Sequence, residues 1–193
     1  MMKPMLMLVG LLCLVAAPAK GESVEQLASS VRELGLGEGA FVIGSRLTED
    51  QFGLARENLL ADTYPGTIKF PSGESVVVAD EKTHLILAIY QSREEVGADD
   101  VKQMVGRLMN MFGEPTTTAH GKLIYWAFGK AGKIDENAFL EAKATGKIDI
   151  LATVKFNSTL DLDPVMDNNM EETGTIYYII TSDRLLDSYI TTP

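Results

Sequence analysis

The chain has 193 residues, and its 17 Lys and Arg against 27 Asp and Glu give a formal net charge of −10 at pH 7. Hydrophobic residues make up 46% of it and charged residues 23%, proportions typical of a folded globular protein rather than a disordered one. The acidic balance argues against a nucleic-acid partner, because a protein that replaces phosphate counterions needs a basic surface. It also argues against docking on anionic lipid.

The first nineteen residues have the pattern of a secretory signal peptide. Lys3 supplies a positive N-terminal region, residues 5–17 are almost wholly apolar, and Ala17-Pro18-Ala19 offers the small residues of a cleavage site. A helix over 5–17 would cover only about 20 Å, less than the roughly 30 Å hydrocarbon core of a bilayer. We therefore expect cleavage before Lys20, export to the periplasm or beyond, and no membrane span in the mature protein.

The single cysteine, Cys13, lies within this predicted leader. Leu12 precedes it where a lipoprotein would need a small residue, so we expect no lipid anchor. Cleavage would leave a mature chain without a thiol, which excludes disulfides, thiolate nucleophiles and cysteine-based zinc sites. Its stability must then come from a hydrophobic core, and we expect residues 20–193 to form a single domain.

Two helices are predicted at the start of this domain. Apolar residues recur at helical spacing over 24–34, and again after Thr48 to about Ala61. A capping-box pair precedes each helix, Ser23 with Gln26 and Thr48 with Gln51. The glycine-rich residues 35–39 between them are interpreted as a flexible connection, followed by a possible short strand at 40–43.

Three closely spaced strands are predicted next, at 67–70, 75–79 and 84–91, with turn residues between them. The short intervals favour antiparallel hairpins, because parallel strands need a long crossover connection. Further strands are predicted at 123–128, 150–156 and 175–181, with helices at 136–144 and from Ser182 to about Ile190. The order indicates an α+β fold with a mainly antiparallel sheet of about six strands and helices packed on it.

The clearest helix covers residues 101–112 and ends at Gly113. Its apolar stripe should pack on the sheet, and its methionines are interpreted as core residues that fill irregular space. The stripe consists of Val101, Met104, Val105, Leu108, Met109, Met111 and Phe112.

The strand at 123–128 carries the only tryptophan and is apolar on both faces. Tyr125 and Trp126 are neighbours on it and must point to opposite faces. One face should meet the helix at 101–112, and the other must be covered by the first two helices, by a second subunit, or by a ligand or partner. The candidate partner-binding residues are Tyr125, Trp126 and Phe128.

The acidic segment 161–172 is the candidate ion site. Counted from Asp161, oxygen-bearing residues stand at positions 1, 3, 7, 9 and 12 of an EF-hand loop, namely Asp161, Asp163, Asp167, Asn169 and Glu172. Val165 and Met166 stand where that loop needs an oxygen ligand and a glycine. The segment is therefore either an irregular Ca²⁺ site or a solvated acidic loop, and no other cofactor is predicted.

Motifs for catalysis are weak in this sequence. It has two histidines, His84 and His120, and neither an H-E-x-x-H nor a G-x-S-x-G pattern. The favoured interpretation is a soluble exported binding module whose partner is another envelope protein or a small apolar ligand. The alternatives are a periplasmic hydrolase whose carboxylates are brought together by the fold, and a Ca²⁺-stabilised structural domain.

The predicted leader has a direct test. The protein recovered from the exported fraction should begin at or within a few residues of Lys20 and carry no lipid, because the cleavage site precedes Lys20 and Cys13 is removed. Intact-mass spectrometry measures this. A mass that includes residues 1–19, or acyl chains on Cys13, would contradict it.

Overall fold

The computed structural model describes residues 22–61, 63–146, 149–162 and 172–190. The predicted signal peptide at 1–19 lies outside these residues, as do Asp163, Asp167 and Asn169 of the predicted ion site. Within them the chain forms one eight-stranded antiparallel sheet and one two-stranded sheet, packed with helices. The predicted α+β class is confirmed, with more strands than expected.

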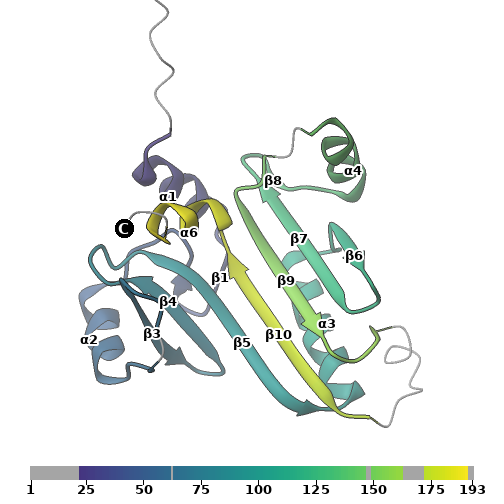
Figure 1. The fold of residues 1–193 in the computed structure, drawn as a ribbon, viewed down its shortest axis with the longest axis horizontal. Coiled ribbons are helices and arrows are strands. Elements are labelled where there is room, and N and C mark those ends of the chain that lie inside the picture. Colours follow the sequence, from purple (N-terminus) through teal and green to yellow (C-terminus); the bar gives the residue numbers. More distant parts are fainter. Residues whose placement is uncertain (1–21, 62, 147–148, 163–171, 191–193) are drawn as a thin grey trace, which may run out of the picture.

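The large sheet has the order β3-β4-β5-β10-β9-β7-β6, and β8 pairs with β7 outside this path. The last strand, β10, is thus inserted between β5 and β9 (Figure 1). In this order the strands are β3 (Thr67–Ser72), β4 (Ser75–Asp80), β5 (Ile86–Val96), β10 (Gly174–Thr181), β9 (Ala152–Ser158), β7 (Leu123–Gly129), β6 (Thr117–Ala119) and β8 (Gly132–Lys133).

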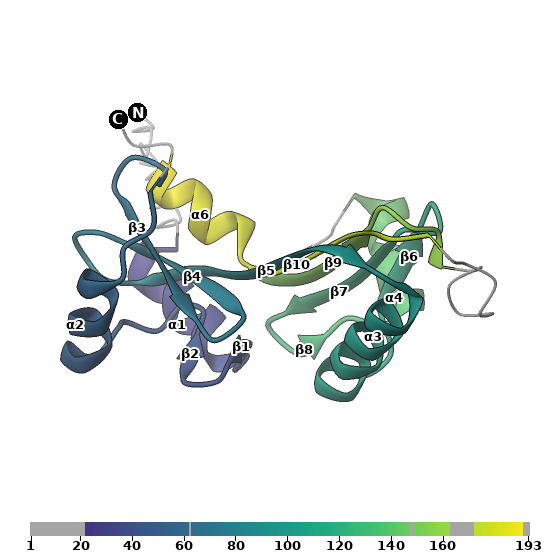
Figure 2. The same cartoon turned by 90° about the horizontal axis from the view of Figure 1, so that it is seen from below.

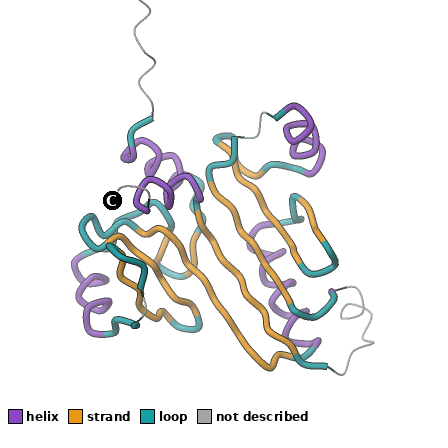
Figure 3. The backbone as a smooth tube through the Cα atoms, viewed as in Figure 1, coloured by secondary structure: helices purple, strands orange, loops and turns teal. Residues whose placement is uncertain are grey.

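β5 extends five residues beyond the predicted end at 91. It continues because β10 offers it backbone partners along its second half, where Ile176 pairs with Arg93 and Gly174 with Val96. The long β5 and β10 thereby connect two lobes of the molecule (Figure 2). Figure 3 shows the strands of the large sheet side by side, with the helices around them.

Most of the supporting structure lies on one face of the sheet. α1 (Val24–Glu33), α3 (Ala98–Phe112) and the hairpin of β1 (Gly37–Glu38) and β2 (Phe41–Val42) lie on that face, and α6 (Asp183–Ile190) lies on the opposite one (Figure 2). α2 (Glu49–Glu57) lies beside β3 (Figure 1). α4 (Glu136–Thr145) follows the β7–β8 turn and is capped by Asp135 as predicted.

The core is built from transverse rows of side chains. The strand registers align one residue from each of six strands, all of them buried: Phe70, Val77, Ile89, Ile180, Val154 and Trp126. α3 covers this face, and its Phe112 ring lies 6.2 Å from Trp126 and 6.4 Å from Phe128. Fully burying each large apolar side chain stabilises the fold by roughly 1.5–3 kcal/mol.

The α3 stripe is only partly core. Val101, Met104, Val105 and Leu108 are buried as predicted. The prediction is wrong for Met109 and Met111, which are 41% and 45% exposed. They lie at the two margins of the stripe, whereas Phe112, further along the helix, still packs against Trp126.

The local signals set the helix starts better than their ends. In both predicted capping boxes the side chains bond reciprocally: Gln26 N donates to Ser23 Oγ at 3.2 Å, and Gln51 N to Thr48 Oγ1 at 3.2 Å. α2, however, ends at Glu57 and not near Ala61. Asn58 Nδ2 donates to the Leu54 carbonyl, and Leu60 N donates to Lys69 O on β3, so the chain leaves the helix for the sheet edge.

The β1–β2 hairpin replaces the flexible connection predicted at 35–39, and its strand β2 falls within the short strand predicted at 40–43, whereas β1 was not predicted. Gly37 is required in it, because a Cβ at this position would lie 2.0 Å from the Phe41 carbonyl oxygen. β6 and β8 were not predicted either, and both are short strands that pair with β7.

The two faces of β7 predict unequal effects of truncation. Trp126→Ala should reduce the free energy of unfolding by about 3–5 kcal/mol, because it empties a fully buried site. Tyr125→Ala should reduce it by about 1–2 kcal/mol, because its ring is only half-buried. Urea denaturation measures both, and equal losses would contradict this placement.

Candidate functional site

The face of the sheet opposite α3 presents two further rows of aligned side chains. We call these two rows the open face. The strand registers define the first as Val76, Tyr90, Ile179, Lys155 and Tyr125, and the second as Ser92, Tyr177, Asn157 and Leu123. Every residue of the first row is half-buried, whereas the row behind it on the α3 side is fully buried.

Tyrosines dominate this surface. The rings of Tyr90 and Tyr177 lie 5.8 Å apart between centroids, and Tyr177 is 37% exposed. Burial, and then the neighbouring Tyr90, raise the pKa of Tyr177; burial and then Asp183 raise the pKa of Tyr125. Both phenols are therefore neutral near pH 7, and they combine an apolar ring with a hydroxyl that can donate or accept a hydrogen bond.

Other parts of the chain cover only the margin of the open face. The adjoining row of Ala88, Thr181, Thr153 and Ala127 is buried, on the side of the sheet where α6 lies (Figure 2). Lys155 Nζ donates to Asp183 Oδ2 at the start of α6, at 3.3 Å. The Phe139 ring of α4 lies 6.0 Å from that of Tyr125. The cover thus comes from α6 and α4, and not from the first two helices.

The predicted partner-binding residues fall on different faces. Tyr125 belongs to the open face. Trp126 is fully buried under α3, and its Nε1 donates to the Gly113 carbonyl at 2.8 Å. Phe128 is 7% exposed on the same face as Trp126. Of the three, only Tyr125 is partly exposed on the open face, and the sequence did not indicate Tyr90 and Tyr177.

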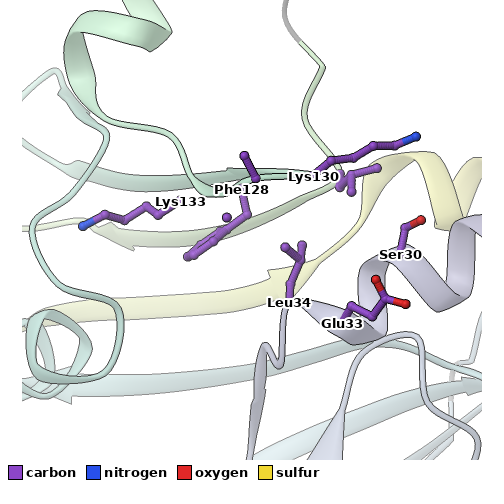
Figure 4. Close-up of a pocket in the computed structure, with 9 residues that line it drawn as sticks. Ser30, Glu33, Leu34, Phe128, Lys130 and Lys133 are labelled. Atoms are coloured by element: carbon purple, nitrogen blue, oxygen red, sulfur yellow. The ribbon is translucent and has the colours of Figure 1, made fainter.

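Phe128 forms the floor of a small cavity of about 490 Å³ between the end of α1 and the β7–β8 turn. Figure 4 shows the ammonium groups of Lys130 and Lys133 pointing away from Phe128 in opposite directions. Lys130 Nζ pairs with Glu22 at 3.4 Å, and Lys133 Nζ donates to Glu114 O at 2.9 Å. Both cations are thus engaged elsewhere, and Glu33 is the remaining charged residue among those that line the cavity.

A polar cluster joins five elements on the α3 side of the sheet. The Glu38 carboxylate of β1 accepts hydrogen bonds from the Tyr178 hydroxyl, from Ser75 Oγ at 2.7 Å and from Arg107 NH1 at 3.1 Å. Arg107 NH2 also donates to Gln91 Oε1 at 3.0 Å. The guanidinium carbon lies 5.8 Å from the centre of the Tyr178 ring.

This cluster is suited to holding the fold together rather than to proton transfer. Burial, and then the hydrogen bond to Glu38, raise the pKa of Tyr178 far above its ordinary value, although Arg107 lowers it slightly. The phenol therefore stays protonated at neutral pH, and the carboxylate already accepts three hydrogen bonds. The Tyr178 phenol is therefore no general acid near pH 7.

The predicted ion site is only partly within the described residues. Asp161 and Glu172 are described, whereas Asp163, Asp167 and Asn169 are not. In the part of the chain that the structure describes, no three His, Cys, Asp or Glu side chains gather as a metal site would require. The Ca²⁺ site stays a prediction.

No helix among the described residues is long and apolar enough to cross a membrane. Comparison with family models, with curated proteins and with solved structures found no match.

The Glu38 cluster predicts a specific loss of stability at high pH. The folded state holds the Tyr178 proton more tightly than the unfolded chain, in which tyrosine has a pKa of about 10. This stabilisation is complete below pH 10 and falls as the pH rises above it. Tyr178→Phe should cost about 1.5–3 kcal/mol at pH 8.

The same variant should lose less of its remaining stability above pH 10 than the wild type does. A residual decline is expected, because the pKa values of Tyr125 and Tyr177 are also raised. Urea denaturation at pH 8 and pH 10.5 measures both effects. Parallel losses in the two proteins would show that Tyr178 does not carry the dependence.

Proposed function

We propose that the protein is an exported binding module that holds another envelope protein against its open face. The observation that supports this most is the half-buried row of Val76, Tyr90, Ile179, Lys155 and Tyr125, which crosses five adjacent strands. Apolar side chains left half-exposed in a continuous patch mark interaction sites on soluble proteins. Tyrosine is also enriched in the energetically important parts of interfaces.

The dimensions favour a protein over a small apolar ligand. Five adjacent strands at about 4.8 Å spacing make this row roughly 19 Å wide. Small ligands are held in clefts that surround most of their surface, whereas the open face is the surface of a sheet. A protein surface can cover its whole width at once.

The open face carries little charge, although the protein as a whole is acidic. The open face contains one charged residue, Lys155, and no carboxylate. The carboxylate of Asp183, which pairs with Lys155, lies at the margin of these rows. Lys155 is already paired with Asp183, so the contact needs little charge from the partner.

Site-specific crosslinking in the envelope fraction tests this proposal. A photo-reactive residue in place of Asn157, which is exposed on the open face, should form a crosslinked product with a partner. Tyr177→Ser should reduce its yield about tenfold, because truncating a central aromatic residue of an interface removes a large share of the binding energy.

Tyr64→Ser is the matched control. Tyr64 is 53% exposed but lies before β3, away from the open face, so this change should leave the yield unaltered. The proposal fails if Tyr177→Ser leaves the product unchanged, or if both serine variants reduce it equally.

A further inference from the structure

A second surface lies on the other side of the sheet, along α3. A groove of about 750 Å³ runs between this helix and the neighbouring strands. α3 contributes two turns of one of its sides, and the sheet contributes the β3–β4 turn and the outer half of β5. The residues that line the groove are Glu74, Arg93, Gln103, Met104, Gly106, Arg107, Asn110 and Met111.

Gly106 lies in the middle of α3, and no contact within the described residues explains a glycine at this position. Glycine is the least favourable residue of a helix interior apart from proline. A Cβ at Gly106 would meet no atom within 4 Å, so no neighbour in the described structure requires its absence. A glycine on the wall of a groove lets the backbone of a bound segment approach closely.

One side of the groove is apolar and is formed by methionine side chains. Met111 is 45% exposed and lines it, next to the buried Met104. Methionine is flexible and polarisable, and it recurs on surfaces that adapt to the apolar face of a bound helix. Gln103 and Asn110 stand seven residues apart on either side of Gly106, about 10 Å along the helix axis.

When its ion pairs are counted, the groove carries a net negative charge. Arg93 is neutralised by Asp100 at 3.1 Å, and Arg107 by Glu38 at 3.1 Å. Glu74 bonds only to the neutral Gln91, at 2.9 Å, and keeps its negative charge. Together with Asp100 and Glu38, the carboxylates that pair with these arginines, Glu74 makes three negative side chains against two positive ones.

We propose that this groove binds a short amphipathic helix with lysine or arginine on its polar side. Its apolar side would pack on Met111 and Met104, its backbone would pass close to Gly106, and its cations would face Glu74 and the neighbouring carboxylates. Gln103 and Asn110 span about two helical turns of the wall, so a segment of two to three turns covers it. This site is separate from the open face and does not depend on the function proposed there.

The probe for this proposal is a synthetic amphipathic peptide of leucine and lysine, of about four helical turns or roughly 14 residues. A counterpart with glutamate at every lysine position is the charge control. Isothermal titration calorimetry with the full-length mature protein should show saturable binding of the lysine peptide, and none of the glutamate peptide. Failure of the lysine peptide to bind overturns the proposal.

Two glycine variants locate the site. Gly106→Gln places a side chain in open space, so it should raise the melting temperature by about 2–4 °C through helix propensity, yet weaken peptide binding at least about tenfold. Gly53→Gln is the matched control, because Gly53 is an exposed glycine inside α2 that also has no atom within 4 Å of its Cβ position. It should stabilise the protein similarly and leave binding unchanged.

A pair of methionines provides an independent test. Met111→Gln should weaken binding about tenfold, whereas Met109→Gln should not, because Met109 is similarly exposed on the same helix but does not line the groove. Unchanged binding by Gly106→Gln, or equal losses for the two methionine variants, would overturn the proposal.

Discussion

The insertion of β10 between β5 and β9 determines which side chains each face of the sheet presents. Ile180 pairs with Ile89 on one side and with Val154 on the other, and these pairs continue the buried row from one lobe to the next. Because strand side chains alternate between faces, a slip of one residue would exchange the two faces completely. Ile180 would leave the core, and Tyr177 and Ile179 would enter it. The open face is therefore a consequence of the same register that builds the core.

The Glu38 cluster connects this register to the groove along α3. Tyr178 lies on β10, and its hydroxyl holds the carboxylate of the β1–β2 hairpin, while Arg107 reaches the same carboxylate from α3. Arg107 also forms part of the groove wall. The bonds from Arg107 to Glu38 and Gln91 hold α3 in position. The ion pair with Glu38 also compensates a positive charge that would otherwise repel a basic ligand. One residue thus links the packing of the two lobes to the electrostatics of a surface.

The sequence predicted those features whose causes are local. Capping boxes at Ser23 and Thr48, the glycine at the end of α3 and the alternation of β9 all act within a few residues. The strand order was not predictable, because β10 pairs with residues of β5 that are 78 to 93 positions away in the sequence. The end of α2 depends equally on a distant group, the Lys69 carbonyl on β3.

The candidate site shows the same limit. The alternation on β7 established that Tyr125 and Trp126 face opposite ways, but only the packing of α3 decides which of them is buried. Tyr90 and Tyr177 become neighbours through the β5–β10 pairing, and nothing in either strand alone indicates it. The groove depends on the β3–β4 turn lying beside α3, which is again a tertiary relation.

The distribution of charge separates the two proposed surfaces physically. Contact at the open face would gain its free energy from burying tyrosine and aliphatic side chains, a term that dissolved salt hardly weakens. Contact in the α3 groove would draw on carboxylates around a partly exposed site, and such interactions are screened over about 8 Å at physiological ionic strength. Ionic strength therefore acts on the two contacts differently, because the two rows of the open face hold no carboxylate, whereas Glu38, Glu74 and Asp100 lie at the groove.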